Sequence, residues 1–244
     1  MQIVGSASYL QERARRRLSG GTLLAAAGGV LFLLSLLLAE MGGDVGAPLA
    51  GLSSFFGLGA LLIGGLRVLS ARRDEATITG EAPVVNQLAA RLSDDYVYLR
   101  HVALRSRGAE ADGVLLGPHG VLVLAIRALG GTFVVRGHDW YAIDEQGDER
   151  AFSRSPSWEL VRTLQAVERG LKEEGLGEVP VQGAVVLVRG KLDDAELPGT
   201  AIVPLDRIAS FVDYLRPAEL PPPEPIRRAV EALQPHVDGR RSGR

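Results

Sequence analysis

Two long uncharged stretches near the start of the chain are almost entirely apolar. They run from Leu18 to Ala39 and from Val45 to Leu66. As a helix, each stretch would be about 33 Å long, and the hydrocarbon core of a bilayer is about 30 Å thick. The pattern therefore predicts a transmembrane helical hairpin over residues 18–70, with spans at about 18–39 and 45–66. A pair of buried core helices and a signal peptide are the alternatives.

Charges around the two stretches predict how the hairpin lies in the membrane. Four arginines in the leader, residues 1–17, precede the first stretch, and three between residues 67 and 73 follow the second. The connection, residues 40–44, has two acids and no base. Because positively charged loops stay in the cytoplasm, we expect a multi-pass protein of the cell membrane with both termini cytoplasmic. Residues 71–79 then form a charged linker.

The rest of the chain alternates between helical and strand patterns. Apolar residues recur at helical spacing from Gly80 to Leu92. Further helices are predicted at 156–174, 205–214 and 225–233, and strands at 96–104, 132–136, 140–143, 181–188 and 200–203. This order predicts an α/β fold, a mixed sheet flanked by helices, over residues 80–216. A proline-rich spacer, a short helix and a tail follow over residues 217–244.

Two unbroken apolar runs lie at the centre of this pattern. Val114–Leu116 and Val121–Leu124 flank the turn Gly117-Pro118-His119-Gly120. Proline and glycine favour a tight turn at such positions. Runs without polar alternation are typical of strands that are buried on both faces. The segment therefore predicts a hairpin in the middle of a sheet that is covered by helices.

The turn also predicts the register of this hairpin. If Gly117 faces Gly120, then Asp112 lies opposite Ala125. Arg127 lies two residues beyond Ala125, on the same face. The centre of the core is thus expected to hold one acid and one cation at neighbouring positions.

Asp112, the Gly-Pro-x-Gly turn and the apolar strand ending in Ile126-Arg127 together resemble the nuclease-related domain (NERD). This family is a branch of the restriction-endonuclease-like superfamily, and the resemblance covers about residues 78–215. It implies a restriction-endonuclease-like fold and metal-dependent cleavage of nucleic acid. The family typically carries Asp on the first strand and Glu-x-Lys at the end of the second, where this sequence reads Ala125-Ile126-Arg127.

Residue by residue, the resemblance implies an incomplete catalytic site. Glu81 matches the family's Gly-Glu on the first helix, and Asp112 matches its metal-binding Asp. Ala125 removes the second metal-binding acid. Arg127 keeps the charge of the lysine, but its guanidinium is a broad planar fork that stays protonated, so the exchange is not conservative.

One further acid leaves two interpretations open. The family's Asn-Pro-x-x-Gln becomes Ser155-Pro156-Ser157-Trp158-Glu159. Glu159 either joins Glu81 and Asp112 around Mg²⁺ or Mn²⁺, or is a solvated acid in the first turn of a helix. In the first case the site is active, and Asp112 and Glu81 are metal ligands. In the second, Asp112 pairs with Arg127 across the hairpin, which is the expected state.

Three functions follow from these alternatives. The first is a membrane-anchored, catalytically inactive nuclease-related domain that acts as a binding or scaffold module for nucleic acid or a protein partner at the cytoplasmic face. The second is an active Mg²⁺-dependent nuclease with a rearranged acidic site. The third is a structural membrane protein whose domain oligomerises. No cofactor is expected in the first case, and Mg²⁺ or Mn²⁺ in the second.

Composition changes this picture little. Hydrophobic residues make up 46% of the chain, and the excess lies near the N-terminus. Residues 1–70 hold five of the 27 basic and three of the 29 acidic residues, which leaves 22 against 26, or a net charge of −4, for the rest. This balance does not favour an extended basic face for DNA. The scattered histidines predict no zinc site, and no Walker or dinucleotide motif predicts a small-molecule cofactor.

Overall fold

A computed structural model describes the chain apart from residues 6–7, 42, 105–107, 197–198, 216–222 and 238–244. It divides into two compact units. A helical unit comprises Ser8–Ile78, and an α/β unit comprises Met1–Ala7 together with Thr79–Arg244. The first prolines of the predicted spacer and the predicted tail lie outside the described residues.

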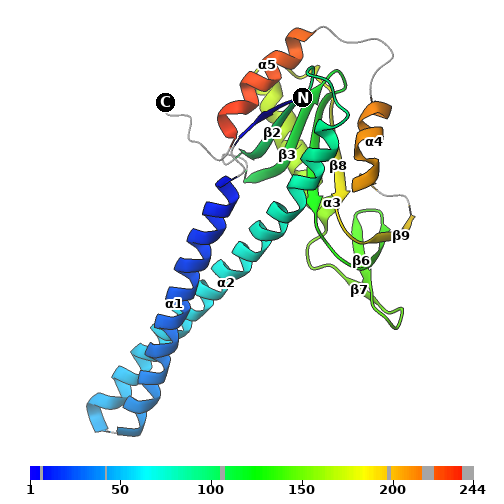
Figure 1. Cartoon of the computed structure of the whole chain (residues 1–244). Helices are drawn as coiled ribbons and strands as arrows, with labels where there is room; N and C mark the ends of the chain where they lie inside the picture. The colour runs from blue at the N-terminus through cyan, green and yellow to red at the C-terminus, as the bar shows by residue number, and fades with distance from the viewer. Residues whose placement is uncertain (6–7, 42, 105–107, 197–198, 216–222, 238–244) are drawn as a thin grey trace. The chain divides into compact units, whose positions relative to one another are not determined.

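The helical unit is a hairpin of two long helices that run side by side (Figure 1). They are α1, Ser8–Met41, and the larger part of α2, Gly43–Ala89. Glycines line the contact between them. A Cβ atom on Gly28 would lie 2.7 Å from the backbone oxygen of Gly57, and one on Gly64 would lie 2.8 Å from that of Gly21. The absence of side chains at these positions lets the two backbones approach closely.

Each helix contains a segment that is long and apolar enough to cross a membrane. These segments are Leu18–Leu37 and Ala50–Val68, close to the predicted spans. Most of their side chains are exposed, including Leu23 at 74% and Phe55 at 75%. A core helix of a soluble protein would bury such side chains, so the exposure argues against that alternative.

Replacing Gly28 by leucine is expected to open the hairpin, because the new side chain would collide with the α2 backbone. Overpacking of this kind typically costs about 1–3 kcal/mol. Gly29 is the matched control, since a Cβ there would meet no heavy atom within 4 Å. Spin labels on cysteines at the exposed positions Leu23 and Leu66 measure the effect in detergent micelles. The distance distribution should broaden in Gly28→Leu and stay unchanged in Gly29→Leu; equal distributions would contradict the glycine contact.

The main sheet of the α/β unit has the strand order β1-β2-β3-β4-β8-β10. Its strands are β1 Gln2–Val4, β2 Val97–Leu104, β3 Ala109–Gly117, β4 Gly120–Arg127, β8 Val181–Leu187 and β10 Ala201–Pro204. The neighbours β2, β3 and β4 are antiparallel, whereas β4, β8 and β10 are parallel. The predicted mixed sheet is therefore confirmed.

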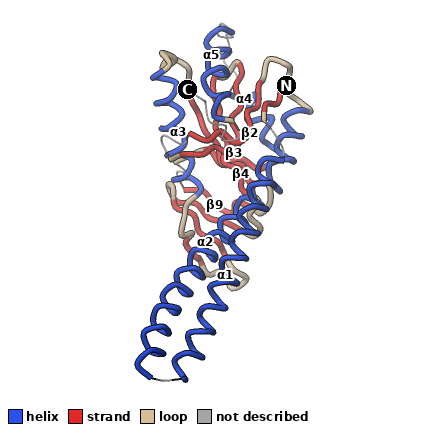
Figure 2. The backbone as a smooth tube through the Cα atoms, turned by 90° about the vertical axis from the view of Figure 1, so that its left-hand side faces the viewer, coloured by secondary structure: helices blue, strands red, loops and turns tan. Residues whose placement is uncertain are grey.

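Helices cover both faces of this sheet, and Figure 2 shows the strands between them. The end of α2 and α4, Ile208–Leu215, bury Val84, Leu88 and Val212 against one face. On the other face, α3, Pro156–Glu173, and α5, Pro223–Leu233, contribute to a second core. The central hairpin supplies side chains to both cores, as its unbroken apolar runs predicted.

A smaller sheet has the order β7-β6-β5-β9. Its strands are β5 Thr132–Arg136, β6 Asp139–Ile143, β7 Glu149–Ala151 and β9 Lys191–Glu196. Trp140 is buried here, and its indole N–H donates to Ser157 Oγ of α3 at 2.8 Å. The described part of the α/β unit also contains the short 3₁₀ helices Leu205–Arg207 and Gln234–His236.

The structure differs from the sequence-based prediction at two places near the helical unit. The leader contains strand β1, which pairs parallel to β2 from Gln2 with Val97 to Val4 with Leu99. Residues 71–79, predicted as a linker, are helical and continue α2 without a break. The reason lies in their composition, since alanine, arginine and glutamate favour a helix and Gly80 is the first glycine after Gly65.

Candidate functional site

The candidate site lies at the open end of the β3–β4 hairpin. The ladder runs from Gly117 paired with Gly120 to Gly113 paired with Leu124, which confirms the predicted register. Asp112 and Ala125 are the next positions on the two strands. Asp112 is anchored to β4 because its Oδ2 accepts a hydrogen bond of 2.8 Å from the backbone N–H of Ile126.

Arg127 connects this acid to a second one on α3. Its Nη1 donates to Asp112 Oδ2 at 2.7 Å, and its Nη2 donates to Glu159 Oε2 at 2.8 Å. The three side chains are partly buried, with 17%, 20% and 16% exposed for Arg127, Asp112 and Glu159. We call these residues the Asp–Arg–Glu cluster. A planar guanidinium suits this bridge, because it presents two donors in a fixed fork.

Local structure places Glu159 in reach of Arg127. Ser155 caps α3 by accepting from the backbone N–H of Trp158, and Pro156 occupies the first turn. The acid therefore sits in the first turn of the helix, where the helix dipole favours negative charge. The structure shows it bound to a cation and partly buried, so it is neither the solvated acid nor, in this arrangement, a partner of Glu81.

Electrostatics keep the bridge charged. Burial disfavours the charged form of Arg127, but the carboxylates of Asp112 and Glu159 outweigh it, and the pKa of Arg127 is raised. The guanidinium thus remains a cation between the two acids. Ala125 is 6% exposed and belongs to the hydrophobic core. Its methyl side chain has no oxygen that could bind a metal ion.

Glu81 lies in a separate polar cluster with residues of β2. It is buried, and its Oε2 lies 3.0 Å from His101 Nε2 in a hydrogen bond. Its Oε1 is 3.6 Å from Arg100 Nε. The preceding Gly80 lets α2 lie close to the end of β4, because a Cβ there would lie 2.9 Å from the Ile126 side chain. The family resemblance pointed to Glu81, but no sequence pattern indicated either of its partners.

Two residues near Glu81 have unusual properties: His101 in its backbone and Tyr98 in its pKa. His101 has a φ of 46°, which is uncommon for a residue other than glycine and costs on the order of 1 kcal/mol or more. Burial, followed by the charges of Glu81 and Asp112, raises the pKa of Tyr98 well above its ordinary value. Tyr98 is therefore a neutral phenol, and the charges of both acids act on it.

This donor set does not fit an Mg²⁺ ion. Mg²⁺ needs near-octahedral oxygen ligands, and several of them must converge. Asp112 and Glu159 converge on a guanidinium instead, and Glu81 is bound to His101 and Arg100. Within the part of the chain that the structure describes, no group of three or more acids or histidines is placed to hold a metal ion.

Comparison with known families finds a match, and it covers the region that holds both polar clusters. Residues 76–188 match the family model of the nuclease-related domain. The matched range begins in α2 and ends just after β8, and it includes every residue of both polar clusters. No curated protein and no solved structure matches the chain.

Proposed function

Because residues 76–188 form a nuclease-related domain, we propose that the chain is a membrane-anchored binding module that has kept the fold of a nuclease but does not cleave. One observation carries the proposal: the Arg127 guanidinium lies between Asp112 and Glu159, at 2.7 and 2.8 Å, where an active site would hold a metal ion. A metal ion at that position would be repelled by the guanidinium.

The helical unit supplies the anchor in this proposal. Its two apolar segments, Leu18–Leu37 and Ala50–Val68, expose their side chains, which a bilayer would cover. Strand β1 precedes the first segment and β2 follows the second, and both belong to one sheet. Both ends of the hairpin must then lie on the same side of the membrane. The arginines at both ends support the cytoplasmic side.

The test uses the full chain in neutral-detergent micelles. Titration with Mn²⁺ and Mg²⁺ in a calorimeter should give no stoichiometric heat, because the described residues hold no open carboxylate cluster that could bind the ion. Incubation with single- and double-stranded DNA and either metal should give no products. Cleavage that disappears in Asp112→Ala would overturn the proposal and favour the active nuclease, with Asp112 and Glu81 as metal ligands.

A further inference from the structure

The two helices of the helical unit pack in a single register, which determines the residues that lie at the same level. A Cβ atom on Gly28 would meet the backbone of Gly57, and one on Gly64 would meet that of Gly21. Both pairs of residue numbers add to 85. In antiparallel helices this sum stays constant, so each α1 residue lies level with the α2 residue that completes it. The buried positions among the described residues of this unit follow the same register, every seventh residue on each helix: Gly21, Gly28 and Ser35 on α1, and Ala50, Gly57 and Gly64 on α2.

This register brings arginines of both helices to one end of the apolar segments. That end is marked by Leu18 on α1 and Val68 on α2. Residues 12–18 lie level with residues 67–73, and the two stretches together contain seven arginines and one glutamate. They span about 9 Å along the helix axis, close to the interfacial layer of about 5–8 Å that flanks the hydrocarbon core. We name the arginines of these stretches the arginine collar: Arg13, Arg15, Arg16, Arg17, Arg67, Arg72 and Arg73.

Nearby acids neutralise only part of the arginine collar. Glu12 lies in the same stretch of α1, and Asp74 and Glu75 follow the collar along α2. Seven arginines against three acids leave a net charge of +4 at this end of the hairpin. The other end, residues 38–47, holds two acids and no base. Repulsion among the arginines is stronger beside hydrocarbon than in bulk water, so a bound anion would stabilise this end of the hairpin and not the other.

Apolar side chains next to the arginine collar are exposed as well. Leu23 and Leu62 share a level, since their numbers add to 85, and they are 74% and 63% exposed. They lie five residues, or about 7 Å, from the end of the collar at Leu18 and Arg67. A ligand with both a phosphate and hydrocarbon chains would contact the cations and these leucines, whereas free phosphate would contact only the cations. This combination favours a phospholipid.

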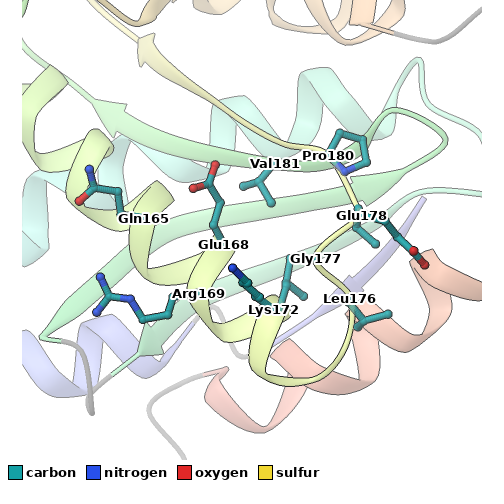
Figure 3. Close-up of a pocket in the computed structure, with 11 residues that line it drawn as sticks. Gln165, Glu168, Arg169, Lys172, Leu176, Gly177, Glu178, Pro180 and Val181 are labelled. Atoms are coloured by element: carbon teal, nitrogen blue, oxygen red, sulfur yellow. The ribbon is translucent and has the colours of Figure 1, made fainter.

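The α/β unit offers a contrasting surface, a groove of about 620 Å³ between α3 and the segment that leads into β8. Figure 3 shows Arg169 and Lys172 in its lining together with Glu168 and Glu178. Two bases and two acids leave no net charge there, so the groove gives no general preference for an anion. Arg169 and Lys172 are both exposed, which makes them suitable positions for a control.

We propose that the arginine collar binds the headgroups of anionic phospholipids. This inference rests on the membrane anchor of the proposed function and names the lipid that the anchor prefers. The lipid phosphate pairs with guanidinium groups, whose two parallel donors match two phosphate oxygens. Arg15 on α1 and Arg67 on α2 have exposed side chains, and Leu23 and Leu62 receive the acyl chains. The net positive charge selects anionic lipids over zwitterionic ones, which carry no net charge.

The test measures lipid binding to the full chain in neutral-detergent micelles by native mass spectrometry. Each arginine near an anionic headgroup contributes about fivefold to the binding constant. With one arginine from each helix, phosphatidylglycerol should bind about 25-fold more tightly than phosphatidylcholine with the same acyl chains. The double variant Arg15→Gln, Arg67→Gln should lose most of this preference, whereas Arg15→Lys, Arg67→Lys should keep most of it. Excess inorganic phosphate should not displace the lipid, because it lacks acyl chains.

The matched control is Arg169→Gln, Lys172→Gln, which removes the same charge from the groove on α3 and should bind phosphatidylglycerol as the wild type does. The proposal is overturned if the two lipids bind the wild type equally, if the control loses as much affinity as the collar variant, or if inorganic phosphate displaces phosphatidylglycerol. Retention of the chain in phosphatidylcholine vesicles after an alkaline wash tests the anchor separately. Loss from these vesicles would reject the membrane anchor itself, whereas retention with equal lipid affinities would reject only the lipid preference.

Discussion

Replacing Arg127 by methionine is expected to lower the free energy of unfolding of the α/β unit by about 3 kcal/mol. Removal of one partner from a buried ion pair typically costs about 3–5 kcal/mol, because the remaining charge is left without compensation. Here two carboxylates, Asp112 and Glu159, would lose their cation at once. Methionine preserves much of the apolar stem, so lost packing adds little. Urea unfolding followed by the fluorescence of buried Trp140 measures the effect.

Arg136 provides the matched control for this prediction. It donates two hydrogen bonds of similar length, 2.6 and 2.8 Å, but both go to the single carboxylate of Glu149, and its side chain is 44% exposed. Exposed pairs contribute about 0–1 kcal/mol, so Arg136→Met should change little. Neutralising the acids in the Arg127→Met background, with Asp112→Asn and Glu159→Gln, should restore part of the loss. A loss in Arg127→Met no greater than that in Arg136→Met would contradict the buried bridge.

The pH dependence of the bridge follows from the direction of the pKa shift. The pKa of Arg127 is raised in the folded protein by the carboxylates of Asp112 and Glu159, which outweigh burial. A cation whose folded pKa is raised stabilises the protein fully below its unfolded pKa, and the contribution is lost only as pH rises through the folded value. The difference between wild type and Arg127→Met should therefore not decline between pH 7 and pH 10.

The hairpin could be predicted from the sequence because its determinants are local. Gly117-Pro118-His119-Gly120 fixes the turn, the turn fixes the register, and the register places Asp112 beside Ala125. The uncharged stretches likewise reveal α1 and α2 through their length alone. The Asp112–Arg127 pair followed from the same reasoning, since both residues belong to one hairpin.

Contacts between distant segments could not be predicted in this way. Strand β1 pairs with β2 although the whole helical unit lies between them in the sequence. A strand of three residues is too short for its sequence pattern to reveal a partner. Glu159 reaches Arg127 across 32 positions because α3 docks on the sheet. The positive φ of His101 has no signal in the sequence.

The double substitution Ala125→Glu, Arg127→Lys is expected to create a metal site at the Asp–Arg–Glu cluster. It restores the Glu-x-Lys pattern of the family, and the new carboxylate would lie opposite Asp112. A lysine is a compact point charge and cannot bridge two acids as a guanidinium does. Without metal, the added buried charge should lower the melting temperature. With Mn²⁺ at about 100 times the dissociation constant, ligand binding should stabilise the variant by about 2.7 kcal/mol.

Two controls separate a coordinated ion from general ionic strength. Ala125→Gln with Arg127→Lys has nearly the same shape without the charge, so Mn²⁺ should not raise its melting temperature. Adding Asp112→Asn to the restored variant should also remove the response, because two carboxylates must converge on the ion. The wild type is expected to show no response to Mn²⁺. If the restored variant Ala125→Glu, Arg127→Lys also shows none, like the two controls, position 125 does not decide metal binding. The wild-type fold would then exclude the ion for a reason other than its missing oxygen and its guanidinium.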